Sequence, residues 1–330
     1  MTLELLPHIH QIKVPLRGNP LGFVNSYLLQ TGAGLILVDC GWNTPDAFAA
    51  LQAGFDEAGS TLADLRYVVV THIHPDHYGL AGRILEHTDA ELVVHERERR
   101  LTDSRYVNYS ELLDATEDWL RVNGVDTDSR PVLQKASLSM LDLVAPAKVG
   151  RCVLGGERLE LGGRTLELLW TPGHSPGHLC LYEPASKLLF AGDHVLERIT
   201  PNVGMTTQTQ SNPLADYQNA LRQIRDLDVA LVAPGHGDAF TDLPGRVDAL
   251  LAHHESRLSE IAAAVRSAGS ATAYDVARSI RWFKPWDALA PFSQRSAVFE
   301  TLSHLEMLLS RGSMHKQTVG GVWRYRCSSQ

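Results

Sequence analysis

Four residues with metal-binding side chains lie in one short segment, Thr71-His72-Ile73-His74-Pro75-Asp76-His77, directly after an apolar run at residues 67–70. Imidazole nitrogens and carboxylate oxygens bind Zn(II) at about 2.0–2.2 Å, whereas closed structural zinc sites more often use cysteine. No cysteine lies near this segment. An apolar run that ends in a polar cluster is typical of a strand leading into a loop. We therefore expect one loop, without helical spacing, to present His72, His74, Asp76 and His77.

A solvated, histidine-rich loop is the ordinary alternative. The chain contains 15 histidines in 330 residues. Independent placement would produce the pattern His-x-His-x-Asp-His in roughly one such chain in several hundred. The pattern therefore favours a metal site over chance.

Three later segments combine glycine with histidine or aspartate after an apolar run. They are Thr171-Pro172-Gly173-His174-Ser175-Pro176-Gly177-His178, Phe190-Ala191-Gly192-Asp193-His194 and Ala233-Pro234-Gly235-His236-Gly237. Glycine allows a sharp turn that aims the next side chain at a site. Taken singly, each is as well explained by a solvated histidine or a Gly-Asp turn. Their joint occurrence indicates ligands that hang from strand ends.

In these four segments the chain resembles the metallo-β-lactamase-fold hydrolase superfamily, whose first metal motif is Thr-His-x-His-x-Asp-His and whose other landmarks follow in this order. The resemblance implies two metal ions per chain. His72, His74 and His174 would bind one, Asp76, His77 and His236 the other, and Asp193 would bridge both. Zinc is the expected metal, and iron and manganese are alternatives because the same nitrogen and oxygen donors accept them.

Four residues near these motifs match weaker landmarks of the superfamily. Asp39 resembles an acidic residue beneath the metals that would fix the tautomer of a ligand imidazole. Cys40 stands where members commonly carry Thr or Ser, which places a thiol near the site. His178 and His194 are interpreted as wall residues rather than ligands.

The first 240 residues are predicted to alternate strands with helices. Thr44-Pro45 is a good helix start, residue 59 is a glycine that ends that helix, and strands are expected at 65–70 and 91–95 with a helix near 80–86 between them. The resemblance implies an α/β fold, an αββα sandwich of two mixed sheets, over residues 1–240. Within it, residues 96–148 form a mostly helical insertion longer than a minimal connection needs.

The apolar residues of this insertion admit two interpretations. They are Leu112, Leu113, Trp119, Leu120, Leu138, Met140, Leu141 and Leu143. One hypothesis makes the insertion a lid over the metal cleft, with an apolar wall for the substrate. The alternative is that these side chains only pack the helices together.

Residues 241–330 are predicted to form a separate, winged-helix-like domain. An apolar stripe from Val247 to Val265 includes His254, which therefore packs rather than binds metal. A helix after Thr272, a third helix from about 291 to 311 and a hairpin around Gly320-Gly321 complete the order. This order resembles the subgroup of the superfamily related to mitochondrial β-lactamase-like protein 2, and certain fungal polyketide thioesterases.

Composition limits the partners and the location. The net charge is −8, from 30 basic and 38 acidic residues, which disfavours nucleic acid as a partner. No apolar run of about 18 residues and no secretory signal is present, so we expect a cytoplasmic protein without membrane attachment. The four scattered cysteines indicate neither disulfides nor a thiolate zinc site. A small-molecule substrate is expected, and a homodimer is left open.

The resemblance implies a metal-dependent hydrolase. A hydroxide bridging two zinc ions would attack a carbonyl carbon, with Asp76 as the catalytic residue that orients it. The glyoxalase II-like Thr-Pro-Gly-His-Ser-Pro-Gly-His segment favours a thioester, ester or lactone of a small, partly apolar substrate. The alternative is a phosphodiesterase or endoribonuclease acting on single-stranded RNA. A metal-stabilised binding module without catalysis is a third hypothesis, and the complete ligand set disfavours it.

Overall fold

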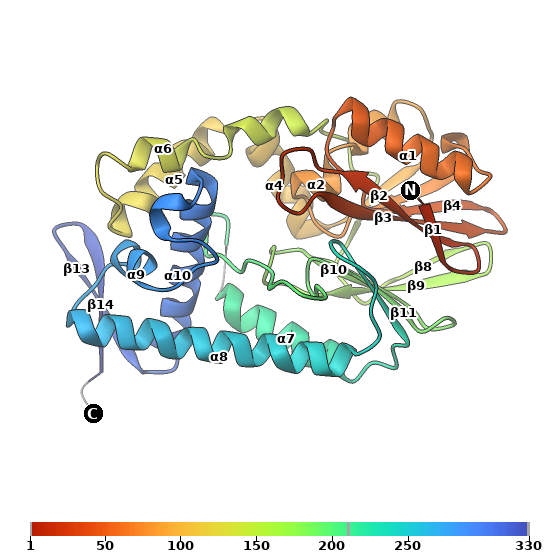
Figure 1. The fold of residues 1–330 in the computed structure, drawn as a ribbon. Helices are drawn as coiled ribbons and strands as arrows, with labels where there is room; N and C mark the ends of the chain where they lie inside the picture. Colours follow the sequence, from red (N-terminus) through yellow and green to blue (C-terminus); the bar gives the residue numbers. More distant parts are fainter. Residues whose placement is uncertain (1, 210–211, 329–330) are drawn as a thin grey trace.

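Two mixed β-sheets lie face to face with helices on their outer sides (Figure 1). This computed structural model describes residues 2–209 and 212–328. The first sheet has seven strands in chain order: β1 (Thr2–Leu6), β2 (Ile9–Pro15), β3 (Phe23–Thr31), β4 (Gly34–Val38), β5 (Leu65–Val69), β6 (Glu91–His95) and β7 (Arg151–Val153). Its strands are antiparallel from β1 to β4 and parallel from β4 to β7.

The second sheet has the strand order β12-β11-β10-β9-β8. Its strands are β8 (Arg158–Leu161), β9 (Arg164–Trp170), β10 (Leu179–Glu183), β11 (Leu188–Gly192) and β12 (Leu231–Pro234). Neighbours pair antiparallel except β11 and β12, which are parallel. The edge strand β12 therefore ends at the same edge of the sheet as β11.

Alternating side chains divide the core into layers, as the period of two in a strand requires. In β4, Ile36 and Val38 face the second sheet, whereas Leu35 and Leu37 pack beneath the outer helices. These helices are α1 (Pro45–Glu57) and α3 (Ala81–Leu85). On the opposite side, α7 (Pro213–Arg225) and α8 (Leu243–Ala268) cover the second sheet. The predicted αββα sandwich is confirmed.

Local signals in the sequence explain where α1 begins. The Thr44 side chain accepts a hydrogen bond from the Ala47 amide at 3.3 Å, and Pro45 occupies the first helical position. Thr44 satisfies an amide that has no partner within the helix, and proline loses no hydrogen bond there. A short 3₁₀ helix, η1 (Leu62–Asp64), then leads into β5.

The insertion after β6 is helical, and part of it packs on the C-terminal region. It contains α4 (Glu96–Tyr106), α5 (Ser110–Val122), α6 (Arg130–Gln134) and the 3₁₀ helix η2 (Leu138–Leu143). Leu120 and Leu133 are buried in one cluster with Tyr274 and Val298. Of the insertion residues named from the sequence, the packing interpretation therefore holds for Leu120.

After α8, the C-terminal region contains α9 (Ala273–Ser279), η3 (Trp286–Ala288), α10 (Pro291–Ser310), β13 (Met314–Val319) and β14 (Val322–Cys327). Gly320 and Gly321, with φ of 58° and 78°, make the hairpin turn that L-residues with side chains adopt only with strain. Leu302 and Leu305 of α10 share a continuous core with Leu189 and Val232 of the second sheet. The division at residue 240 and the winged-helix assignment stay predictions. No helix in the described ranges has the length and apolar character needed to cross a bilayer.

Candidate metal centre

The first motif lies at the carboxyl end of β5. The strand ends at Val69, and His72 and His74 follow it, the latter in extended backbone. Asp76 and His77 instead lie in a single helical turn, α2 (Pro75–Tyr78), which begins with Pro75. The expectation of one loop without helical spacing is therefore wrong for these two residues. A proline at the first helical position favours such a turn, and the turn rotates both side chains toward the centre.

The other three residues of the predicted set follow strands of the second sheet. His174 comes after β9, Asp193 directly after β11 and His236 after β12. Because the two sheets stack, their strand ends meet at one edge of the sandwich. The structure brings all seven residues of the predicted set together there.

Three imidazoles converge in the first half of the cluster. His72 Nε2 lies 2.8 Å from His74 Nδ1 and 3.2 Å from His174 Nε2, and the last two nitrogens are 3.0 Å apart. Burial, together with neighbouring histidines, lowers the pKa of His72 and of His74 well below the usual value. Three neutral imidazoles that aim nitrogens at one point match the donors of a zinc ion, which binds deprotonated nitrogen.

The second half of the cluster combines imidazoles with carboxylates. Asp76, His77 and His236 offer one donor atom each within 4.8 Å of one another. His236 Nε2 lies 3.3 Å from Asp76 Oδ2 and 3.6 Å from Asp193 Oδ1, and His77 Nε2 lies 3.4 Å from Asp193 Oδ1. The other Asp193 oxygen, Oδ2, lies 3.6 Å from His174 Nε2. Asp193 therefore faces both halves, one oxygen to each.

In three of these histidines, Nδ1 points away from the cluster and contacts a hydrogen-bond acceptor outside it. His77 Nδ1 contacts Asp39 Oδ2 at 2.7 Å. His236 Nδ1 contacts the Phe23 carbonyl at 2.9 Å, and His174 Nδ1 the Asn202 carbonyl at 2.8 Å. A proton on Nδ1 leaves the Nε2 lone pair free to bind a metal. Asp39 has the position that the resemblance implies for it.

Several buried polar atoms of the cluster lack a hydrogen-bond partner among the described residues, namely His77 Nε2, His236 Nε2 and Asp193 Oδ1. Such atoms are costly to bury without a partner. A Cβ on Gly235 would lie 2.5 Å from Asp193 Oδ1 and 2.7 Å from His77 Cε1, so no side chain fits there. Orphaned donor atoms, a backbone cradle and neutral imidazoles together fit a pair of metal ions.

Charge supports the same conclusion. Burial alone lowers the pKa of His77, but Asp193, Asp39 and Asp76 outweigh burial and raise it well above the usual value. Burial raises the pKa of Asp193, whereas His236 and His77 lower it to well below its usual range. The second half thus concentrates buried carboxylates that require positive charge, which a divalent cation supplies.

A buried glutamate that the sequence did not single out fastens both ligand-bearing loops. Glu98, in α4, accepts hydrogen bonds from the Ile73 amide at 3.0 Å and from the Gly177 amide at 2.6 Å. The Tyr106 hydroxyl, also in α4, donates to the Ile73 carbonyl. The insertion therefore holds the segments that carry His72, His74 and His174. An acidic residue in a charged helix gave no signal for this role.

The wall residues and the thiol have clear positions. His178 Nε2 accepts a hydrogen bond from the Asp193 amide at 3.1 Å, and His178 Nδ1 contacts Thr171 Oγ1 at 2.9 Å. His178 lies outside the three donor groups, as does His194. The Cys40 thiol donates to the His77 carbonyl, and burial raises its pKa. The thiol near the site is therefore protonated and enclosed, which argues against oxidation sensitivity.

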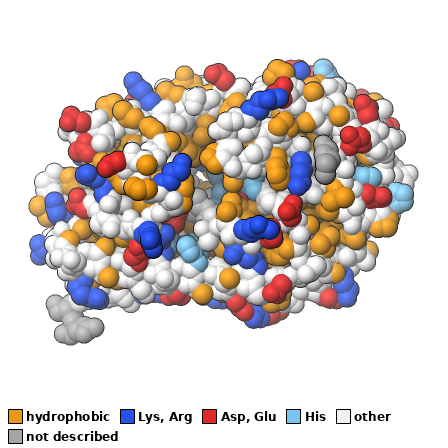
Figure 2. Space-filling view, in the orientation of Figure 1, with side chains coloured by type: hydrophobic (Ala, Val, Ile, Leu, Met, Phe, Trp, Pro, Cys, Tyr) orange, Lys and Arg blue, Asp and Glu red, His pale blue; other side chains and the backbone are white. Residues whose placement is uncertain are grey.

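A cavity of about 450 Å³ opens at the metal-ligand cluster. Figure 2 shows this face of the molecule hollowed near its middle, with histidine side chains visible in the hollow. Its walls include His74, Asp76, His174, Asp193 and His236. Apolar side chains from the insertion and α10 form the opposite wall: Tyr106, Tyr109, Leu112, Leu113, Leu138, Met140, Leu141, Phe292 and Phe299. The insertion thus contributes a wall as well as packing.

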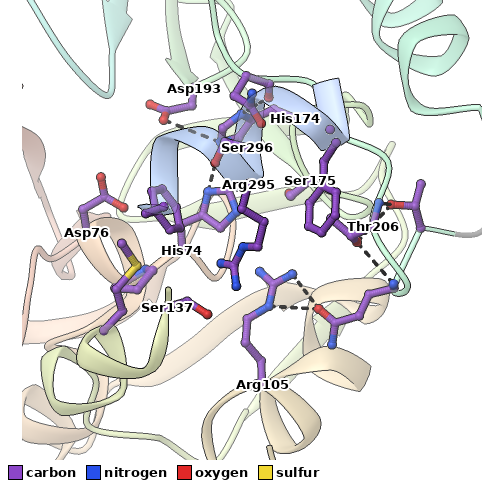
Figure 3. Close-up of a pocket in the computed structure, with 18 of the residues that line it drawn as sticks. His74, Asp76, Arg105, Ser137, His174, Ser175, Asp193, Thr206, Arg295 and Ser296 are labelled. Carbon is purple, nitrogen blue, oxygen red and sulfur yellow. Dashed lines mark hydrogen bonds and ion pairs between the residues drawn. The ribbon is translucent and has the colours of Figure 1, made fainter. Parts of the chain in front are cut away.

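Three arginines line this cavity, and one of them, Arg97, lies over the Trp170 ring. The other two are Arg105 from α4 and Arg295 from α10 (Figure 3). The sequence analysis gave neither a role at the site. They lie 190 positions apart, in helices assigned to different regions, and no motif surrounds either one. Only the packing of α10 against the insertion brings them together.

Comparison with known proteins identifies relatives of the whole chain. A family model described as the metallo-beta-lactamase superfamily matches residues 19–236. The crystal structure of a metallo-beta-lactamase family protein from Thermus thermophilus superimposes with a TM-score of 0.84 at 31% identity, covering 98% of this chain and 100% of that one. The similarity thus includes the C-terminal region.

Two curated relatives are similar over most of the chain. The Beta-lactamase-like protein 2 homolog of Caenorhabditis elegans is 28% identical, covering 79% of this chain and 72% of its own length. The probable metallo-hydrolase YqjP of Bacillus subtilis is 29% identical, covering 73% of this chain and 75% of its own length. Both matches are consistent with the geometry of the cluster.

Proposed function

The chain belongs to the metallo-β-lactamase superfamily, and on that premise we propose that it is a binuclear zinc hydrolase that cleaves a thioester, ester or lactone of a small, partly apolar substrate. The hydrolase class follows from the family, and the cluster of histidine and aspartate donors is present in this structure. What we propose is the identity of the metal and of the bond that is cleaved. Metal-assisted hydrolysis needs no nucleophilic side chain.

The residues assigned to each ion follow the two halves of the cluster. His72, His74 and His174 would hold one ion, Asp76, His77 and His236 the second, and Asp193 both. When bound, two zinc ions would supply a water of lowered pKa and a Lewis acid for the carbonyl oxygen.

Asp76 has the position of the residue that orients the attacking water. It lies on the cavity wall, and its Oδ2 is 3.3 Å from His236 Nε2. Burial raises the pKa of Asp76, but His77 and His236 lower it below the usual value, so its carboxylate is ionised. An ionised oxygen at the cavity edge accepts a hydrogen bond from water and directs the water's lone pair at the substrate.

The apolar wall opposite the metal ligands is the observation that favours a carbonyl substrate. Leu112, Leu113, Leu138, Met140 and Leu141 face the cavity from two separate helices of the insertion. A cavity of about 450 Å³ suits one acyl group or lactone ring and leaves little room for a polymer.

A phosphodiesterase is the second candidate, and the arginines favour it. Arg97, Arg105 and Arg295 all line the cavity, and guanidinium groups bind phosphate well. The net charge of −8 and the size of the cavity favour a small diester over single-stranded RNA.

Initial rates on one substrate panel test the proposal. The panel contains medium-chain acyl thioesters, a homoserine-type lactone, bis-(p-nitrophenyl) phosphate and single-stranded RNA, each with zinc-loaded protein and with Asp76→Ala. Preferential hydrolysis of a carbonyl substrate, lost in Asp76→Ala, is the expected result. Cleavage of the phosphodiester or of RNA alone would contradict the proposed carbonyl hydrolase and favour the second candidate, a phosphodiesterase.

A further inference from the structure

We infer that Arg105 and Arg295 form an anion subsite, and that the substrate carries a carboxylate or phosphate group at a distance from the bond that is hydrolysed. This inference rests on the proposed function and names a substrate feature that the metal centre does not determine. It follows from four observations on the two guanidinium groups.

The first observation is that the two groups share one space. Figure 3 shows the Arg105 and Arg295 side chains extending toward each other from opposite walls of the cavity, beside His74. Burial first, and then the charge of Arg105, lowers the pKa of Arg295 to about 10. Two like charges that approach within a half-buried cavity repel each other, and an anion between them would remove that cost.

The second observation is the absence of a counter-ion. Within the part of the chain that the structure describes, neither arginine forms an ion pair with a carboxylate. Other arginines nearby are paired: Arg100 contacts Glu96 at 2.9 Å, and Arg130 contacts Glu117 at 2.8 Å. Arginines that are held without an acid at a cavity wall leave their charge available to a ligand.

The third observation is that both side chains are held in place and keep donors free. Arg105 donates from Nε and Nη2 to Gln208 Oε1 at 3.1 and 2.7 Å. Arg295 donates from Nη1 to the carbonyls of Leu133 and Gln134, both at 3.3 Å. Arg295 Nη2 forms no hydrogen bond in the described parts of the chain, whereas Arg105 also interacts with the Tyr106 hydroxyl. Fixed, unsatisfied N–H groups bind a carboxylate or phosphate with little loss of entropy.

The fourth observation is that apolar residues line the same cavity as the arginines and the metal ligands. Apolar wall residues such as Leu112 and Met140 share the cavity with both groups. A substrate that spans it would place its carbonyl at the metal centre, an apolar segment along this wall and an anionic end at the arginines. A short acyl chain with a terminal carboxylate, or a thiol part that bears a phosphate, has this arrangement.

Matched pairs of thioesters test the subsite. One arm compares the glutaryl thioester of N-acetylcysteamine with the neutral pentanoyl thioester, and the other compares acyl phosphopantetheine with acyl pantetheine. In the arm that carries the correct anion, we expect kcat/KM to be at least about 100-fold higher for the anionic member. Arg295→Met and Arg105→Met should each remove most of this preference and change the rate on the neutral member less than about threefold.

Two variants separate the subsite from a structural role. Arg295→Lys keeps the charge and should restore part of the preference, whereas loss of a purely structural contact would affect both members of a pair equally. Arg100→Met, on the same helix as Arg105 but largely exposed and paired with Glu96, should behave as wild type. Melting temperatures of all variants exclude unfolding as the cause.

The outcomes distinguish the inference from the proposed function. Equal rates on both members of each pair, or a preference that survives both arginine substitutions, would overturn the anion subsite and leave the hydrolase intact. If no thioester is turned over, calorimetric titration of the same proteins with glutarate and with inorganic phosphate decides the subsite independently. Binding that is weakened at least about tenfold in Arg295→Met supports it, and unchanged binding refutes it.

Discussion

The metal centre and the cavity wall are built in opposite ways. All seven residues of the centre follow the ends of strands, and four of them lie within six positions of one another. The wall comes from the insertion and α10, which are far apart in the chain and meet through the cluster of Leu120, Leu133, Tyr274 and Val298. Such a division lets one part preserve the reaction while the other selects the substrate.

The two regions also differ in what their contacts do. Buried acceptors such as Asp39 and Glu98 hold the centre rigidly. The wall residues Leu112 and Leu141 are half-buried and face space. We therefore expect changes in the centre to reduce the rate on every substrate, and changes in the wall to alter the preference between substrates.

The largest effect is expected in the centre. Asp76→Ala or His77→Ala should reduce kcat at least about a thousandfold on every substrate, because each removes a donor to the second ion and Asp76 also orients water. Metal content measured by mass spectrometry should fall by about one zinc per chain. His315→Ala, exposed on β13, is the control. Full activity in both variants would disprove the binuclear mechanism.

A smaller effect is expected where the insertion holds the centre. Glu98→Gln replaces one carboxylate oxygen by an amide donor that faces a backbone N–H, so one of the two loop contacts is lost. Zinc affinity, measured by competition with a chelator, should fall about 10- to 100-fold. Glu96→Gln, on the same helix and paired with arginines instead, should bind zinc as wild type does.

The wall should respond selectively. Leu112→Ala shortens an apolar side chain of the cavity, so kcat/KM for a medium-chain acyl thioester should fall about tenfold. The rate on bis-(p-nitrophenyl) phosphate should change little, because that substrate does not need the acyl contact. Val107→Ala, an exposed residue outside the cavity wall, is the matched control. An equal fall on both substrates would mean that Leu112 supports the centre and does not select the substrate.

The smallest effect is expected on stability, at a contact that links α10 to the metal centre. Glu300 of α10 accepts a hydrogen bond from Asn202 Nδ2 at 2.7 Å, and the Asn202 carbonyl contacts His174. Burial raises the pKa of Glu300 to about 7 from 4.5. The native state therefore binds more protons than the unfolded state between these values, so the free energy of unfolding falls as pH rises through about 7.

Glu300→Gln keeps the acceptor and removes this titration. Between pH 5 and pH 8 its free energy of unfolding should fall less than that of the wild type, by on the order of 1 kcal/mol. Urea denaturation at both pH values measures the difference. Identical pH dependence in the two proteins would show that the pKa of Glu300 does not differ between the folded and the unfolded state.

The predictability of the site follows the same division. The resemblance to the superfamily, carried by four short motifs, implied all seven residues of the cluster, because each motif is local and follows its own strand. The same reasoning missed the helical turn that carries Asp76 and His77. It also placed Arg295 in the third helix of a separate winged-helix-like domain, whereas packing directs this side chain into the cavity.

Sequence by itself determined the family, the set of candidate metal-ligand residues and the layered fold that supports them. Metal-ligand types, turn residues and alternating apolar residues in strands act over a few positions, so they can be recognised in the sequence alone. Tertiary structure alone decided the substrate side of the site. Whether Leu112 lines a cavity or packs a helix, and whether Arg105 meets Arg295 or a carboxylate, depends on how the insertion docks on α10. That docking depends on the burial of apolar surface, which is non-directional. Many arrangements of the same residues bury a similar area, so the sequence alone does not identify the one that forms.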